Sequence, residues 1–321
     1  MEDQTNGHIV LLGATGTIGK AALDRLLADG YQVTCVGRSK SGRPNGAEFI
    51  SCDLEDEGMV FEKAFKGRAV KAVISCIASR TGVPEDAWAV DYQINRSVLK
   101  AARKAGVKQF VLLSAICVQR PLLAFQQAKL AFEAELQKSD LVWTIVRPTA
   151  FFKSLSGQLD RLQKGKPFLI FGDGKLTACK PISDPDLAQF IVNSLSDETH
   201  HNAILPIGGP GPAITPLEQG EELFRLMGKQ PKFQSVSPKL LSGIAGILGF
   251  FGYLVPPLRT KAALARIGHY YATQSMLVLN PETGEYDADL TPSFGKDTLF
   301  DHYRSLLNTN TREDLREHRV F

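Results

Sequence analysis

The sequence predicts an α/β protein in which helices cover both faces of a doubly wound parallel sheet, with a smaller lobe toward the C-terminus. An apolar run from Ile9 to Leu12 is typical of a buried strand, and it leads through a glycine-rich loop into a helical pattern. Further strand-like segments then alternate with helical ones, as they do in parallel sheets. The 321 residues, 44% of them hydrophobic and 22% charged, are enough for about two soluble domains.

The loop after the first strand, Gly13 to Gly19, carries glycines at its first, fourth and seventh positions. This spacing lets the backbone turn tightly, approach a pyrophosphate closely and present the N–H groups of a helix N-terminus to its charge. Because a strand precedes the loop and a helical pattern follows it, the sequence indicates dinucleotide binding by a Rossmann fold. The residues predicted to hold the cofactor here are Gly13, Thr15, Gly16, Thr17, Ile18 and Gly19.

We therefore expect residues 1–165 to form mainly the nucleotide-binding Rossmann domain. Residues 166–307 are expected to form mainly a substrate-binding lobe, with some segments returning to the sheet, and residues 308–321 a polar tail. The elements expected after residue 165 include strands over Phe168 to Phe171 and Ala203 to Ile207, and helices over Asp184 to Leu195 and Leu217 to Met227.

The end of the second strand, Gln32 to Val36, predicts which dinucleotide binds. Enzymes that prefer NAD usually carry an acidic residue there, which binds the ribose 2′-hydroxyl and repels a 2′-phosphate. This chain has Arg38, whose guanidinium suits a phosphate, with Ser39 and Arg43 as further donors. The predicted cofactor is therefore NADPH. The alternative is that these are solvated loop residues.

The third and fourth strands predict further cofactor contacts. Asp53, just beyond the third strand, is expected to accept a hydrogen bond from the adenine amino group while Leu54 covers the ring. The alternative is that Asp53 caps a helix that begins near Glu57. After the fourth strand, the small segment containing Ile77 and Ala78 allows the cofactor to lie along the strand ends, where ligands bind in open parallel sheets.

The fifth strand, Gln109 to Leu113, places Ser114 at its carboxyl end. An irregular stretch is expected next, before Lys129 begins an amphipathic helix that runs to Leu136. An earlier helix is expected from Asp91 to Ala105. Its Asn95 is either a polar residue of the active site or an amide on the helix surface.

The glycine loop, Ser114 and the segment Phe125 to Lys129 together resemble the short-chain dehydrogenase/reductases, whose catalytic set is a Ser, a Tyr-x-x-x-Lys pair and often an Asn. The chain keeps the Ser and Lys positions, but Phe125 stands where the Tyr belongs. The resemblance implies that Ser114, Phe125 and Lys129 line the catalytic site and that Lys129 bonds the nicotinamide ribose. The alternatives are a surface lysine and a serine that only closes its strand.

Four longer segments resemble a more specific family, the 3,8-divinyl (proto)chlorophyllide a 8-vinyl reductases, which are atypical short-chain reductases. They are Leu113 to Leu123, Phe125 to Lys129 with Phe132 to Leu136, Arg147 to Leu155 and Gly268 to Met276, within a match that spans residues 8–306. The resemblance implies reduction of the C8 vinyl group of divinyl chlorophyllide a or divinyl protochlorophyllide a to ethyl, with NADPH and without a metal or a flavin.

Such an activity accounts for Phe125. A carbonyl reductase needs an acid to neutralise a developing alkoxide, and phenylalanine cannot donate a proton. A hydride added to the outer carbon of a vinyl group leaves an anion that the conjugated macrocycle delocalises. We therefore hypothesise that the protein mainly orients the nicotinamide against the vinyl group, that Phe125 packs against one of them, and that water or a nearby donor delivers the proton.

The sixth strand, Trp143 to Val146, is followed by the last predicted site residues. Backbone groups of Pro148 and Thr149 are expected to hold the nicotinamide carboxamide. Phe151 and Phe152 are candidates for contact with the tetrapyrrole macrocycle. Since adjacent aromatic residues are usually divided between core and site, we expect at most one of them to stack on the ring.

Residues 240–255, Leu240 to Val255, are almost all apolar or glycine. They are too few for the roughly 20 residues that span a bilayer, and Pro256-Pro257 ends any helix. Three interpretations remain: a hydrophobic wall over the tetrapyrrole, a patch that contacts a membrane surface peripherally, or a buried helix of the lobe. Nearby Lys261 and Arg266 could attract substrate carboxylates or anionic headgroups.

The overall composition excludes some function classes. A net charge of +3, without a basic stripe interleaved with aromatic residues, argues against nucleic-acid binding. Five cysteines, an odd number without metal-ligand spacing, indicate reduced thiols in a cytosol-like compartment. The polar, acidic N-terminus resembles neither a signal nor a transit peptide. We expect a cytoplasmic protein, either fully soluble or peripheral to photosynthetic membranes, and predict no metal site.

Two alternatives from other functional classes remain at this stage. One is a non-catalytic NADP(H) sensor similar to the nitrogen-metabolite repressors, which share this fold and also lack the catalytic Tyr. The other is an assembly factor that holds NADPH within a membrane complex. Among enzymes, a phenylpropanoid double-bond reductase is the relative to exclude. The sequence does not predict the oligomeric state.

Overall fold

The computed structural model describes residues 6–38, 46–252 and 256–309, and its chain divides into two compact units. The first unit comprises Met1–Pro148 and Asp184–Leu205, and the second Thr149–Ser183 and Pro206–Phe321. Two predicted cofactor residues, Ser39 and Arg43, lie outside the described residues, as do residues 310–321 of the predicted tail.

A seven-stranded sheet in the order β3-β2-β1-β4-β5-β6-β8 forms the centre of the first unit. Neighbouring strands from β3 to β6 pair in parallel, and the direction of winding reverses between β1 and β4. This is the doubly wound α/β arrangement that the sequence predicts, and ligands bind such sheets at this reversal. The strands are β1 (His8–Leu12), β2 (Gln32–Gly37), β3 (Glu48–Ser51), β4 (Val70–Ser75), β5 (Gln109–Leu113), β6 (Val142–Pro148) and β8 (Ala203–Ile207).

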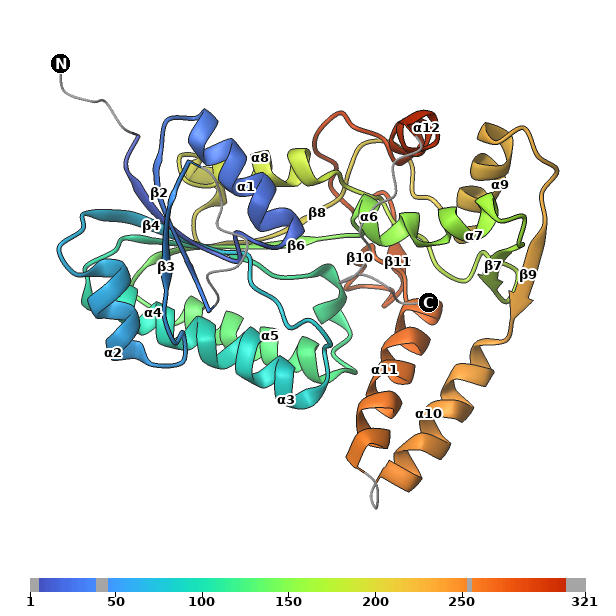
Figure 1. Ribbon diagram of the computed structural model, residues 1–321, viewed down its shortest axis with the longest axis horizontal. Coiled ribbons are helices and arrows are strands. Elements are labelled where there is room, and N and C mark those ends of the chain that lie inside the picture. Colours follow the sequence, from blue (N-terminus) through green and yellow to red (C-terminus); the bar gives the residue numbers. More distant parts are fainter. Residues whose placement is uncertain (1–5, 39–45, 253–255, 310–321) are drawn as a thin grey trace. The chain divides into compact units, whose positions relative to one another are not determined.

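Helices cover both faces of this sheet, with α1 and α8 together on one face and α2, α4 and α5 on the other (Figure 1). The largest side chains of the second face are fully buried, among them Phe65, Phe110 and Phe132. The helical segments of the unit are α1 (Thr17–Ala28), α2 (Glu57–Val60), η1 (Phe61–Phe65), α3 (Pro84–Ala87), η2 (Trp88–Ile94), α4 (Asn95–Lys104), η3 (Ile116–Gln119), α5 (Ala124–Gln137), α8 (Asp184–Asn193) and η5 (Glu198–His200).

The helix predicted from Asp91 to Ala105 is longer and more irregular than expected. It begins with α3, passes through the π-helical segment η2 and continues as α4. Pro84 occupies the first turn of α3, where proline's missing N–H group costs nothing. Asp91 therefore lies within a widened turn rather than at a helix start.

The helix predicted to begin at Lys129 begins at Ala124 instead, so this prediction was wrong by more than one turn. Gln126 explains the early start, because its side-chain oxygen accepts the N–H of Leu123 (2.9 Å) and its amide donates to the carbonyl of Cys117 (3.0 Å). The end of the stretch expected to be irregular, from Ala124 onward, is consequently helical. Phe125 and Lys129 now lie one turn apart on one helix.

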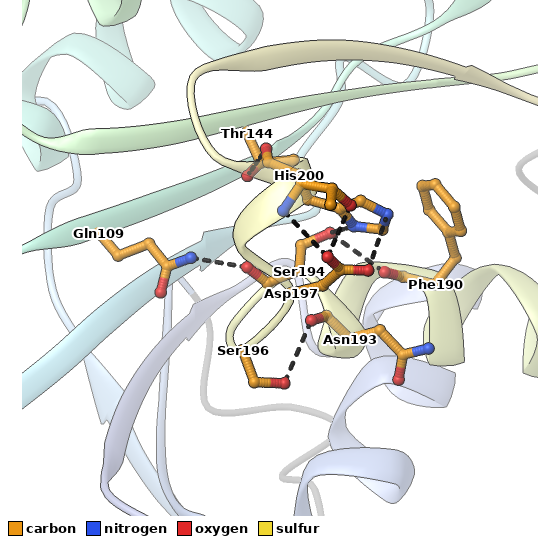
Figure 2. Close-up of polar contacts among 9 residues, drawn as sticks. Gln109, Thr144, Phe190, Asn193, Ser194, Ser196, Asp197 and His200 are labelled. Atoms are coloured by element: carbon orange, nitrogen blue, oxygen red, sulfur yellow. Dashed lines mark hydrogen bonds and ion pairs between the residues drawn. The ribbon is translucent and has the colours of Figure 1, made fainter.

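A polar cluster joins the end of α8 to the sheet (Figure 2). Gln109 of β5 donates to the carbonyl of Ser194 (2.7 Å), and Thr144 of β6 donates to that of His200 (2.8 Å). The Ser194 hydroxyl contacts His200 Nδ1 (2.9 Å), while His200 Nε2 lies 3.6 Å from Asp197. Despite these residue types the cluster is structural, since Ser194 is fully buried and its hydroxyl cannot reach a substrate.

The second unit contains a small sheet and a separate apolar core. Its β7 pairs in parallel with β9, and β10 pairs with β11. Tyr303 and Phe168 lie in its core. The elements are α6 (Phe152–Leu155), η4 (Ser156–Gln158), α7 (Leu159–Gln163), β7 (Phe168–Phe171), α9 (Pro216–Leu226), β9 (Phe233–Val236), α10 (Pro238–Gly252), α11 (Pro256–Thr273), β10 (Val278–Leu279), β11 (Tyr286–Asp287) and α12 (Leu299–Thr309).

The apolar segment that begins at Leu240 forms most of α10, which packs against α11 as a helical hairpin. Leu240, Ile244 and Ile247 are 56%, 40% and 61% exposed, so the interpretation of α10 as a buried helix is wrong for the described side chains. None of the helices in the described part of the chain combines the length and the apolar character needed to cross a bilayer.

Candidate active site

The glycine loop lies between β1 and α1, and its geometry requires glycine at two positions. Gly13 has a φ of +80°, and a Cβ atom there would lie 2.7 Å from the carbonyl carbon and oxygen of Cys76, directly after β4. A Cβ atom on Gly19 would lie 2.0 Å from the Gly13 carbonyl oxygen. The first glycine thus lets the loop pass the end of β4, and the third lets α1 pack against the loop.

Gly16 has a different role, because a Cβ atom there would approach no closer than 3.4 Å to the Gly13 oxygen. Gly16 is the N-cap of α1, and its N–H donates to the Gly13 carbonyl (2.9 Å). The first turn of α1 contains no acidic residue, and no side chain caps it. Its N–H groups and positive dipole end therefore fit a pyrophosphate group.

The other predicted residues of the loop surround this helix start. Thr15 is exposed and Thr17 is half-buried, whereas Ile18 is buried beneath them. Across the loop, directly after β4, Ile77 is half-buried and Ala78 is exposed. The predicted pyrophosphate cradle and the strand end along which the cofactor is expected to lie are thus both at the carboxyl edge of the sheet.

Arg38 follows β2 at the same edge, and its side chain is exposed. Its carbonyl accepts a hydrogen bond from the Ser51 hydroxyl at the end of β3 (3.2 Å). This bond fixes the backbone from which the guanidinium projects. The position therefore suits the 2′-phosphate of NADPH, as the sequence predicts.

Asp53 and Leu54 differ in exposure, and only Asp53 is at the surface. The alternative that Asp53 caps the following helix is wrong, because Asp56 caps α2 by accepting the N–H of Met59 (2.9 Å). Asp53 instead accepts the N–H of Glu55 (3.0 Å). Leu54 packs in the core beside the sheet, so little of its side chain is available to cover an adenine ring.

Phe125 and Lys129 lie on the buried face of α5, and Lys129 forms an ion pair that the sequence analysis did not predict. Its Nζ atom lies 2.9 Å from Asp91 Oδ1, with the Lys129 side chain 10% exposed and that of Asp91 fully buried. The interpretation of Lys129 as a surface lysine is therefore wrong. Because Phe125 offers no hydroxyl, the Lys129 ammonium has a carboxylate as its neighbour instead of a tyrosine.

Ser114 also has a partner that sequence reasoning missed. Its hydroxyl donates to Glu133 Oε1 (2.5 Å), and Glu133 forms an ion pair with Arg147 of β6. Glu133 is almost completely buried, and it lies one turn after Lys129 along α5. That spacing is the one signal in the sequence that could have indicated its place on the same helix face.

Asn95 is buried and therefore is not a surface amide. Its side-chain oxygen accepts the hydroxyl of Ser75 (2.6 Å), the last residue of β4. Its amide nitrogen donates to the carbonyl of Asp91 (3.1 Å). Asn95 thus connects the strand end to the widened turn that holds the Lys129 counterion.

The predicted residues after β6 differ in their surroundings. Pro148 is the buried last residue of β6 in the first unit. Thr149 belongs to the second unit, where its hydroxyl donates to the Lys180 carbonyl and its N–H to that of Ile207 (2.9 Å). Phe152 lies in the core of the second unit, whereas Phe151 is half-buried. Of the two, Phe151 is the one whose ring surface remains available to a macrocycle.

The first unit thus gathers a nucleotide-binding loop, a buried lysine and a serine at the carboxyl edge of one sheet. Burial raises the pKa of the Cys76 thiol beside the loop to about 12, which disfavours the thiolate that a nucleophile requires. All five cysteines are free in the structure. Within the described residues no group of three or more His, Cys, Asp or Glu side chains could hold a metal ion. The arrangement suits the binding of a dinucleotide and the transfer of a hydride.

Comparisons with known proteins agree with this geometry. Residues 13–198 match a family described as NAD(P)H-binding. The chain is 47% identical over 333 aligned residues to the chloroplastic divinyl chlorophyllide a 8-vinyl-reductase of Cucumis sativus, covering 98% of this chain and 80% of the relative. It is 46% identical to the Arabidopsis thaliana protein of the same description, covering 94% and 76%. Among solved structures, the NADPH-dependent quinone oxidoreductase QOR2 of Escherichia coli aligns with this chain at a TM-score of 0.67 and 21% sequence identity. The alignment covers 94% of this chain and 100% of QOR2, so the two proteins share a fold.

Proposed function

The chain belongs to the divinyl chlorophyllide a 8-vinyl-reductases, and from this premise we propose that it uses NADPH to reduce the C8 vinyl group of divinyl chlorophyllide a or divinyl protochlorophyllide a to ethyl. The observation that carries the proposal is the identity of 46–47% to these relatives over nearly the whole chain. Phe125 at the position of the usual catalytic acid supports it independently, because a vinyl group needs no donor for an alkoxide.

NADPH, when bound, supplies the hydride for this reaction. The start of α1 holds the pyrophosphate through backbone N–H groups, and Arg38 binds the 2′-phosphate. Lys129 binds the nicotinamide ribose, and Phe125 packs beside the nicotinamide or the vinyl group and excludes water from it. Since the conjugated macrocycle delocalises the charge on the reduced alkene, the main task of these residues is to orient the two reactants.

The direct test is turnover of the purified full chain. We expect that incubation with NADPH and divinyl chlorophyllide a shifts the Soret band toward the blue as the vinyl group becomes ethyl. NADPH binding without any shift would instead favour a sensor or an assembly factor, the two alternatives that hold the cofactor without using it. Phenylpropanoid double-bond substrates, offered in the same assay, are expected not to react.

Phe125→Tyr tests the interpretation of the missing acid. We expect the variant to keep the fold and NADPH binding but to gain no reduction of ketones or aldehydes, because Lys129 stays paired with Asp91. Its vinyl turnover should change, since the added hydroxyl alters the surface beside the reacting groups. A variant whose vinyl turnover equals that of the wild type would place Phe125 outside the site.

As part of the same proposal, the hairpin of α10 and α11 contacts the surface of a photosynthetic membrane peripherally. The exposed face of α10 is apolar, and residues 238–273 contain four Lys or Arg residues but no Asp or Glu. We expect the full chain to sediment with phosphatidylglycerol vesicles, and Ile247→Glu to abolish this. Leu290→Glu, at another exposed apolar position of the second unit, is the matched control. Equal sedimentation of wild type and Ile247→Glu would refute the membrane contact.

A further inference from the structure

The ion pair between Asp91 and Lys129 is unusual because both partners are buried. Asp91 Oδ1 lies 2.9 Å from Lys129 Nζ, and the two carboxylate oxygens also lie 3.4 Å from the N–H of Ser79, in the loop after β4. The Asp91 side chain is completely shielded from solvent. One carboxylate thus links α5, which carries Phe125 and Lys129, to the loop along which the cofactor is expected to lie.

The backbone around Asp91 is shaped to hold the carboxylate in this place. Asp91 lies within the π-helical segment η2, a rare widened turn of a kind that is frequent at functional sites. Asn95 stabilises the turn by donating to the carbonyls of Asp91 (3.1 Å) and Val90 (3.4 Å). Because Ser75 in turn donates to Asn95 (2.6 Å), the turn is anchored to the end of β4.

Stability alone gives little reason for such a pair. Removing two opposite charges from water costs about as much as their attraction returns, and well-packed apolar residues often serve a core equally well. A partly exposed lysine on the edge of a core would normally extend its ammonium into solvent. Here the ammonium instead lies against a carboxylate whose side chain is fully buried.

We infer that Asp91 is a positioning residue for the reductase reaction, which fixes the Lys129 ammonium where it binds the nicotinamide ribose. The inference rests on the proposed function. An ammonium has three N–H donors, and Asp91 occupies one of them, which leaves others for ribose hydroxyls. Phe125 has no hydroxyl that could contact the ammonium, whereas Asp91 contacts it directly and so holds it in place in this chain.

Asp91 also balances charge. A lysine without a counterion beside the nicotinamide would oppose the loss of a hydride, because the ring becomes cationic as the hydride leaves. The Asp91 carboxylate makes the pair neutral overall, so this repulsion is reduced. Its removal is therefore expected to slow turnover in addition to weakening cofactor binding.

The test compares Asp91→Asn, which removes the charge, with Asp91→Glu, which keeps it. NADPH binding is followed by the fluorescence of the reduced nicotinamide with the full chain and without any tetrapyrrole. We expect Asp91→Asn to raise the NADPH Kd about tenfold, the loss of ~1.4 kcal/mol, and Asp91→Glu to restore most of the affinity. Asp140→Asn, which removes the same charge from the exposed pair with Arg103, should leave the Kd unchanged.

A second variant controls for a loss of stability, because an unpaired buried lysine could unfold the chain. In Asp91→Asn combined with Lys129→Met, no charge is left unpaired, so the thermal midpoint should recover. The NADPH affinity should not recover, because the ribose ligand is lost. The inference is overturned if Asp91→Asn binds NADPH as the wild type does below its thermal midpoint, or if restoring the midpoint in the double variant also restores the affinity.

Turnover then separates this inference from the proposed function. If the wild type binds NADPH and does not reduce divinyl chlorophyllide a, the proposed function fails while the binding measurements still decide the role of Asp91. If the wild type does reduce it, we expect Asp91→Asn at saturating NADPH to have a lower kcat than the wild type, with Asp91→Glu intermediate. A kcat equal to that of the wild type would refute the role of Asp91 in charge balance.

Discussion

Gly16→Ala is the most specific perturbation of the proposed cofactor site. Gly16 caps α1 with a φ of −79°, which any residue adopts, and a Cβ atom there would approach no atom closer than 3.4 Å. The substitution therefore leaves the protein itself almost unstrained. The added methyl group instead projects from the loop whose backbone must approach the pyrophosphate.

The expected magnitudes differ between folding and binding. Alanine at a compatible position changes the free energy of unfolding by less than ~1 kcal/mol. Displacing the pyrophosphate from two backbone N–H groups loses charged hydrogen bonds worth about 1.5 kcal/mol each. The total of ~3 kcal/mol corresponds to an increase of about a hundredfold in the NADPH Kd. Gly19→Ala behaves differently, because its Cβ atom would lie 2.0 Å from the Gly13 oxygen and would cost about 3 kcal/mol of folding free energy or more.

The assay measures NADPH fluorescence and the thermal midpoint for the same samples. Without cofactor, Gly16→Ala should unfold near the wild-type midpoint, and NADPH should raise that midpoint much less than it raises the wild type's. Gly157→Ala is the control, since a Cβ atom at position 157 would have no described atom within 4 Å and the φ of Gly157 is not positive. Wild-type NADPH affinity in Gly16→Ala would refute the assignment of the pyrophosphate to this loop.

The remaining predictions concern the cofactor's phosphate, the buried ion pairs and the dependence of stability on pH. Arg38→Asp should raise the Kd for NADPH about tenfold or more without raising that for NADH, since it exchanges a phosphate ligand for a repulsive charge; an unchanged ratio of the two constants would contradict the assignment of NADPH. Arg147→Met should lower the free energy of unfolding by about 3 kcal/mol, because it leaves Glu133 buried without its cation. Arg103→Met, at an exposed ion pair, should lower it by less than ~1 kcal/mol. Urea unfolding measures both free energies, and equal losses in the two variants would contradict the prediction. Burial, with a smaller contribution from a nearby arginine, lowers the pKa of His8 from 6.5. As the pH falls, His8 is therefore protonated in the unfolded chain at a higher pH than in the folded chain. The free energy of unfolding should consequently decrease as the pH falls below 6.5. The thermal midpoint of His8→Gln should fall less over that range than that of the wild type, and parallel curves would contradict the prediction.

The sheet and the nucleotide loop could be predicted from the sequence because local patterns determine them. Continuous apolar runs such as Ile9 to Leu12 occur in strands buried on both faces, and they appear as β1 and its neighbours. The glycine spacing carries its own geometric reason, since Gly13 and Gly19 each face a backbone atom that leaves no room for a side chain. Both features are visible in a short stretch of sequence, although the atoms that Gly13 faces, those of the Cys76 carbonyl, belong to a distant part of the chain.

The starts of two helices were predicted wrongly for identifiable reasons. The helix through Asp91 extends backward to Pro84 through a π-helical turn, a feature that apolar periodicity does not indicate. The helix through Lys129 starts at Ala124 because Gln126 caps it from within, so the usual Ser, Thr, Asp or Asn is absent from its N-cap. In both cases polar contacts determine where the helix begins.

The buried charges could not be predicted from the sequence, because Asp and Glu are rarely buried without a partner and the partners lie on other elements. Asp91 and Lys129 are far apart in the chain, as are Ser114 and Arg147. Only the strand order, which places β4, β5 and β6 side by side, brings these residues to one edge of the sheet. Sequence resemblance indicated the serine and the lysine but not the two carboxylates that hold them.

These carboxylates change how the missing tyrosine is understood. A carbonyl reductase needs a free donor beside the substrate oxygen, yet in this chain the Ser114 hydroxyl is already donated to Glu133 and the Lys129 ammonium is paired with Asp91. The Ser114 hydroxyl and the Lys129 ammonium are thus each held by a buried carboxylate rather than poised to protonate an oxyanion. Replacing Phe125 by tyrosine would add a phenol but would not free either group. Such an arrangement suits a substrate that carries its own charge sink, and a conjugated vinyl group meets that requirement whereas an isolated ketone does not.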